Sequence, residues 1–128
     1  MLCLSLRKPY ADWILQGRKT IEIRHWNIPK KCSLPMTVFI HTSKTIDEKM
    51  MTANDQLPSG CIVGSITITG VKKYASREEF MQDKEQHLAG TAFYAERRTY
   101  GFVLKDPVPV KPRPYKGMLG FFEVDLKP

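Results

Sequence analysis

Apolar and polar residues alternate over several short stretches of the chain, and each such stretch predicts a β-strand. From residue 20 the isoleucines at 21 and 23 face one side of an extended chain, whereas the other side carries Thr20, Glu22 and Arg24. Similar patterns rich in β-branched and apolar residues predict strands over residues 2–6, 36–41, 61–71 with a bend at Gly64, 99–105 and 119–126. We therefore expect about five or six strands.

Three segments carry helix signals. Pro9 suits a first helical turn and Gly17 a stop, which predicts a helix over residues 10–16 whose apolar face, formed by Tyr10, Trp13 and Ile14, packs into the core. Residues 45–48 and 76–79 have the capping-box pattern, which predicts a helix to about Thr52 and a polar, peripheral helix over about 77–88 that covers a pocket.

A proline-rich connector is expected at 107–114, between the last two strands. Together these elements predict an α+β fold: a mixed, mainly antiparallel β-barrel of five or six strands with two or three short peripheral helices. The 128 residues, 42% apolar and 26% charged, suffice for one domain over residues 1–128. No apolar run approaches the roughly 20 residues that span a bilayer, and the N-terminus lacks a secretory signal, so we expect a soluble monomer without a membrane partner.

The three cysteines and three histidines are too few and too widely spaced for a disulfide framework or a zinc site. We therefore expect a reducing, cytoplasmic location and no metal or other cofactor. The net charge of +7 lies at the two ends, +5 over residues 1–32 and +3 over residues 91–128. If the ends meet in space they form one positive face suited to phosphates; a merely soluble basic surface is the alternative.

Five motifs, in order, carry a family resemblance. They are LSLRKPYA at residues 4–11, GRKTIEIR at 17–24, IHTSK at 40–44, YGFVL at 100–104 and KGMLGFFEV at 116–124. In this order and over nearly the whole chain they resemble the ASCH domain family, named after activating-signal cointegrator homology. The resemblance implies a PUA-like barrel with a cleft near these motifs and a role in binding RNA or a modified nucleoside.

Within this picture Glu22 and Arg24 share one side of a strand, where Glu22 can accept from a cytosine-like amine while Arg24 contacts phosphate or a carbonyl. A purely structural Glu22–Arg24 pair is the alternative. Lys19 is a candidate phosphate contact or base, Arg7 and Lys8 are candidate anion contacts near a helix start, and Trp26 either stacks a base or packs in the core. His41, Ser43, Lys44 and Lys116 are further candidates for the mouth of the cleft, with ordinary loop positions as the alternative.

An enzyme is the second hypothesis. Some relatives in the superfamily remove acetyl from acetylcytidine with a Gly-x-Lys-Thr-x-Thr motif, and others are metal-independent ribonucleases. Here Gly17, Lys19 and Thr20 match, but Glu22 stands where that motif has its nucleophilic second threonine. If the protein is a hydrolase, Lys19 and Glu22 are the candidate catalytic residues.

Overall fold

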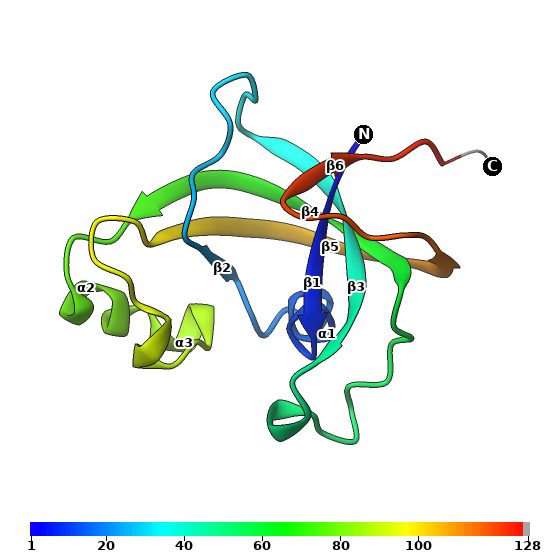
Figure 1. The fold of residues 1–128 in the computed structure, drawn as a ribbon, viewed down its shortest axis with the longest axis horizontal. Helices are drawn as coiled ribbons and strands as arrows, with labels where there is room; N and C mark the ends of the chain where they lie inside the picture. The colour runs from blue at the N-terminus through cyan, green and yellow to red at the C-terminus, as the bar shows by residue number, and fades with distance from the viewer. Residues whose placement is uncertain (127–128) are drawn as a thin grey trace.

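Six strands form one sheet in the computed structural model of the protein, which describes residues 1–126 (Figure 1). Along the sheet the strand order is β2-β5-β4-β3-β1-β6. The strands are β1 (Leu2–Lys8), β2 (Ile21–Arg24), β3 (Met36–Ile46), β4 (Cys61–Lys73), β5 (Tyr100–Pro114) and β6 (Phe121–Glu123). The short helices are α1 (Tyr10–Leu15), α2 (Arg77–Gln82) and α3 (Lys84–His87), with single 3-10 turns η1 (Glu48–Met50) and η2 (Thr91–Phe93).

The predicted mixed, mainly antiparallel sheet is confirmed. β1 and β3 pair in parallel, and the other four neighbouring pairs are antiparallel. The sheet is strongly curved (Figure 1), but within residues 1–126 no ladder joins β2 to β6, so the closed barrel is not confirmed. The side chain of Trp26 approaches across this gap, with its ring 5.6 Å from that of Phe102 on β5 and 5.5 Å from that of Phe121 on β6.

The core lies between the concave side of the sheet and α1. Gly17, at φ +79°, follows α1 and ends it where the sequence predicts. Trp13 and Ile14 are buried as expected, whereas Tyr10 is only partly buried. The buried apolar residues around α1 come mainly from four strands: Leu4, Leu6, Val38, Ile40, Val63, Ile66, Ile68, Phe102 and Leu104.

The predicted helix from residue 45 is wrong. β3 continues to Ile46, which pairs with Lys8 of β1, and only the short turn η1 follows. The capping-box pattern does not act because Thr45, which would be its N-cap, lies within β3, where its amide donates to Ser43 Oγ at 3.0 Å. Long-range strand pairing therefore outweighs a local capping signal here.

The proline-rich segment at 107–114 is not a connector but the second half of β5, paired with β4. β2 pairs only with residues 100–103 of β5, so beyond Val103 one edge of β5 faces no strand in the described chain. Prolines are tolerated on such an edge because no ladder partner there requires their missing N–H groups. The last predicted strand is also shorter than expected, since β6 covers only Phe121–Glu123.

The predicted polar helix at 77–88 is two helices, α2 and α3, divided at Asp83. Its start is confirmed, since Ser76 Oγ accepts a hydrogen bond from the Glu79 amide at 3.1 Å. α3 ends at His87, and the next residue, Leu88, adopts a left-handed conformation two residues before the expected stop at Gly90. α3 contacts β2, the strand at one edge of the sheet, and α2 packs against α3 farther from β2 (Figure 1). Within the described chain, no helix has the length and apolar character needed to cross a bilayer.

Candidate nucleic-acid interface

A cavity of about 640 Å³ lies beside β2 and opens to solvent. It is lined mainly by the 17–26 segment, by β1 and α1, and by the chain that follows α3. We call it the Glu22 cavity, and its lining residues are Ser5, Leu6, Arg7, Tyr10, Lys19, Glu22, Ile23, Arg24, His25, Trp26, Ser43, Thr45, Leu88, Ala89, Phe93 and Leu119. The cleft thus lies at the motifs that carry the family resemblance.

The signature residues form one ion-pair cluster in this cavity. Glu22 Oε2 accepts from Arg24 Nε and pairs with Arg24 Nη2, both at 2.9 Å. Lys19 Nζ lies 3.6 Å from the other oxygen, Oε1. The predicted shared side of Glu22 and Arg24 is confirmed, and the intramolecular pair exists. Both residues nevertheless line the cavity, and among the described residues Oε1 accepts no hydrogen bond shorter than this 3.6 Å contact. Glu22 therefore keeps acceptor capacity for a ligand.

Lys19 is held by the backbone as well as by Glu22. Its amine donates to the carbonyl oxygen of His87, at the end of α3, and lies 5.9 Å from the centre of the Tyr10 ring. Burial lowers the pKa of Lys19, and the Glu22 carboxylate opposes that shift. Burial also raises the pKa of Tyr10 to about 12, helped by its hydrogen bond to Asp47. Lys19 thus ties α3 to the signature strand while presenting a cation to the cavity.

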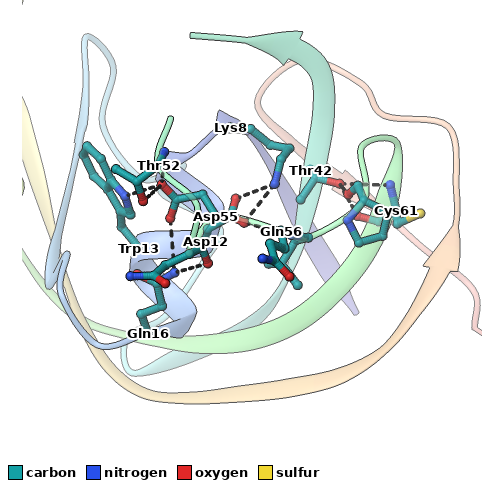
Figure 2. Close-up of polar contacts among 12 residues, drawn as sticks. Lys8, Asp12, Trp13, Gln16, Thr42, Thr52, Asp55, Gln56 and Cys61 are labelled. Carbon is teal, nitrogen blue, oxygen red and sulfur yellow. Dashed lines mark hydrogen bonds and ion pairs between the residues drawn. The ribbon is translucent and has the colours of Figure 1, made fainter. Parts of the chain in front are cut away.

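Arg7 and Lys8, predicted together, are separated by the alternation of β1. Arg7 is exposed and lines the Glu22 cavity. The Lys8 side chain is only 4% exposed, and its amine donates to both carboxylate oxygens of Asp12, at 2.9 and 2.8 Å. Figure 2 shows this pair beside Asp55, which holds Trp13, Gln16 and Thr52. Lys8 therefore lies in a structural network away from the cavity lining.

Trp26 packs in the core and also lies in the lining of the Glu22 cavity. It packs edge-on against Phe102 and Phe121, as a core residue does. The Arg24 guanidinium lies 5.6 Å from the centre of its ring. A half-buried indole with one side open to a cleft can stack a base while its other side stays packed.

The remaining candidate ligand-binding residues line a second cavity, of about 930 Å³. We call it the Lys116 cavity, and its lining includes His41, Ser43, Lys44 and Lys116, together with Ser5, Gly60, Tyr115, Gly117 and Leu119. His41 is buried, its Nε2 lies 2.7 Å from the Tyr115 carbonyl oxygen, and its Nδ1 lies 2.9 Å from Ser5 Oγ. Because a carbonyl only accepts, Nε2 carries the proton and Nδ1 accepts from the serine hydroxyl.

Sequence reasoning missed several lining residues. Ser5 lies within a predicted strand, where no pattern marks it as a cavity residue. Tyr10 is predicted to face the core from α1, yet it also lines the cavity. Leu88, Ala89 and Phe93 enter the Glu22 cavity from the chain after α3, which agrees with the expected cover over a pocket but had no residue-level signal. Leu119 lines both cavities and is 99% exposed. An exposed apolar residue beside a glycine-rich loop is the signal that points to it.

His87 should make the stability of this region depend on pH. Its Nε2 donates to the Phe80 carbonyl oxygen at 2.7 Å and its Nδ1 accepts from the Ala89 amide at 2.9 Å, so the folded ring is neutral. Burial lowers its pKa from the ordinary 6.5, with nearby Lys19 and Lys84 acting in the same direction and Asp83 and the Phe80 hydrogen bond opposing. The unfolded chain therefore binds the extra proton first, and stability present above about pH 6.5 is lost as the pH falls toward the lowered folded pKa.

We expect the free energy of unfolding to fall from pH 7.5 to pH 5.5, by up to about 1.4 kcal/mol per pH unit. The midpoint of urea unfolding should fall with it. His87→Gln should be less stable at pH 7.5 but show a smaller change over this range. An unchanged pH dependence in the variant would contradict the assignment.

Comparisons with known proteins decide the family. The model of the ASCH domain matches residues 4–116 of the chain. The chain belongs to the ASCH domain family. Among solved structures, the ASCH protein from Zymomonas mobilis superposes with a TM-score of 0.74 at 14% identity, covering 97% of this chain and 87% of that one.

Two variants of the same Zymomonas mobilis ASCH protein superpose as well. The variant with a serine replaced by alanine has a TM-score of 0.72 at 16% identity, with coverage of 97% and 87%. The variant with a tyrosine replaced by phenylalanine has a TM-score of 0.66 at 19% identity, with coverage of 88% and 74%. Identities this low establish a shared ASCH fold and nothing further. No curated protein sequence matches the chain.

The ASCH fold explains why the two charged ends of the chain meet. β1 and β6 are neighbours, and the N-terminal amine lies 3.5 Å from Glu123. The basic segments at the two ends therefore contribute to the same region, with Arg7 and Arg24 in one cavity and Lys116 in the other. The cysteines at 3, 32 and 61 are free, and no group of three or more potential metal ligands occurs within residues 1–126.

Proposed function

We propose that this ASCH domain binds RNA or a nucleotide, with one base held in the Glu22 cavity. The observation that carries the proposal is the carboxylate of Glu22, fixed by Arg24 on one oxygen and available on the other. The cavity around it is also lined by two further cations, Arg7 and Lys19, and by the aromatic rings of Tyr10, Trp26 and Phe93. A carboxylate oxygen accepts from the exocyclic amine of cytosine, while Arg7, Lys19 and Arg24 offer charge to phosphate or carbonyl groups.

Titration of labelled single-stranded RNA at two salt concentrations tests this proposal. We expect binding at low salt that weakens as salt rises, because phosphate contacts release counterions. The absence of binding at low salt, or binding without salt dependence, would contradict a phosphate-driven mode.

Trp26 should report base stacking directly. The chain has two tryptophans, and in Trp13→Phe protein Trp26 is the remaining one. Phenylalanine keeps an aromatic ring at this buried position, beside Tyr10 and Arg18, and loses the long indole hydrogen bond of 3.4 Å to Asp55, so the variant should fold. We expect cytidine monophosphate to quench Trp26 emission, because a base stacked on the indole alters its excited state. Ribose 5-phosphate, which lacks a base, is the control; binding measured by calorimetry without any change in emission would contradict stacking.

Hydrolysis in the same cavity is the second candidate, and the lowered pKa of Lys19 is the observation that favours it. Against it, Thr20 is exposed and is not among the lining residues, so the hydroxyl next to Lys19 in the sequence does not enter the cavity. Incubation with acetylcytidine decides the matter: release of cytidine, lost in Lys19→Met, would establish an amidohydrolase, whereas unchanged substrate leaves binding as the function.

A further inference from the structure

The Lys116 cavity adjoins the Glu22 cavity rather than lying apart from it. Ser5, Ser43 and Leu119 line both. Ser5 joins them physically, since its carbonyl oxygen accepts from Arg24 Nη2 at 3.0 Å and its hydroxyl donates to His41 Nδ1 at 2.9 Å. The two cavities therefore adjoin each other at Ser5, Ser43 and Leu119.

The charge of the Lys116 cavity differs from that of its neighbour. In the Glu22 cavity, Lys19 and Arg24 are paired with Glu22. Among the described residues, the lining of the Lys116 cavity contains Lys44 and Lys116 but no carboxylate, and neither lysine makes an ion pair there. Two exposed, unpaired ammonium groups with no acid beside them attract an anion.

The backbone around the two lysines is fixed. The Tyr115 amide donates to the Gly60 carbonyl oxygen at 3.0 Å, and its own carbonyl oxygen accepts from His41, which holds Lys116 at the rim. The Lys44 side chain lies along Gly60, where an added Cβ would be 3.6 Å from its Cε. An added Cβ at Gly117 would be 2.6 Å from His41 Cε1, so the loop lies directly against the imidazole. Hydrogen bonds and close packing therefore fix the backbone beside the two lysines.

We propose that the Lys116 cavity is a second nucleotide site and that the ligand is single-stranded RNA of two or more nucleotides rather than a free nucleoside. The inference rests on the proposed function of the Glu22 cavity. One base enters that cavity, the chain passes over Ser5 and Ser43, and phosphates beyond it meet Lys44 and Lys116. The two volumes, about 640 and 930 Å³, each suit a small-molecule-sized ligand, so one nucleoside does not fill both. The exposed Leu119, between them, offers an apolar surface to a base.

The test compares cytidine monophosphate with cytidine di-, tetra- and hexanucleotides by calorimetry or fluorescence anisotropy. We expect affinity to rise by about tenfold or more from the mononucleotide to the tetranucleotide, as charge-assisted contacts are added. Lys44→Gln/Lys116→Gln should lose that gain and lower the log–log salt slope by about 1.4, the value for two phosphate contacts on a single strand.

Lys30→Gln/Lys31→Gln is the matched control, because these exposed lysines line neither cavity and their loss changes the net charge equally. Oligonucleotides that bind no more tightly than cytidine monophosphate, or equal losses in the two double variants, would overturn the second site while leaving the Glu22 cavity intact. If neither the mononucleotide nor any oligonucleotide binds at low salt, the proposed function itself fails.

Discussion

Asp12→Ala is expected to lower the free energy of unfolding by about 3–5 kcal/mol, because it leaves the Lys8 ammonium buried without a partner. The two side chains are 4% and 1% exposed and lie 2.8 Å apart (Figure 2). Asp12 Oδ2 also accepts from the Leu57 amide at 3.0 Å, so its removal leaves a backbone donor unpaired as well. Equilibrium unfolding in urea measures the loss.

Two controls separate a buried charge from a general packing defect. Lys8→Met/Asp12→Asn removes both charges and keeps an oxygen for the Leu57 amide, so it should be far more stable than Asp12→Ala alone. Lys72→Met breaks the pair with Asp83, in which the lysine is 45% exposed, and should cost less than about 1 kcal/mol. A double variant as unstable as Asp12→Ala would contradict the charge argument.

Glu22→Gln is expected to abolish the preference for cytidine over uridine nucleotides. The glutamate offers only acceptors, which suit the cytosine amine, whereas a glutamine also donates and can meet the uracil carbonyl. A discrimination of about 1–3 kcal/mol per base contact corresponds to roughly 5- to 150-fold in the ratio of affinities. Competition between cytidine and uridine monophosphates measures it.

Glu22→Gln keeps the size of the side chain and an oxygen for Arg24, so the cavity should persist. Thermal unfolding checks this, since the variant leaves the buried Lys19 without its anion. Tyr10→Phe is a useful companion, because it removes a hydroxyl that is directed to Asp47 rather than to Glu22. The Tyr10→Phe variant should keep the preference for cytidine over uridine nucleotides. A preference that survives in Glu22→Gln would show that Glu22 does not contact the base.

Local patterns predicted the strands best where burial and alternation agree. The sequence of β2 has a clear period of two, and the Pro9 to Gly17 frame of α1 needs only neighbouring residues. Predictions that rested only on capping boxes or prolines at the ends of elements were less accurate. The capping box at 45–48 lost to pairing with β1, and the prolines of 107–114 were tolerated because half of β5 lies on an edge.

The candidate site shows the same division. The side shared by Glu22 and Arg24 followed from strand periodicity, and the structure confirms it. Whether a given lysine is buried or exposed could not be predicted from its neighbours in the sequence. Lys8 and Lys116 each lie beside a glycine or proline, yet Lys8 is buried against Asp12 and Lys116 stands at the rim of a cavity. Burial of a charge depends on whether a partner from another turn or strand arrives, which no local pattern records.

The sequence by itself determined the class of elements, the basic ends and the side of β2 that carries Glu22 and Arg24, because these depend on composition and on the period of a short segment. Only the tertiary structure decided which residues meet. The parallel pairing of β1 with β3 brings Ser5 to His41, and the turn after α3 brings the His87 carbonyl to Lys19. The members of the first pair are 36 positions apart in the sequence and those of the second are 68 apart, so both contacts depend on the packing of the whole sheet.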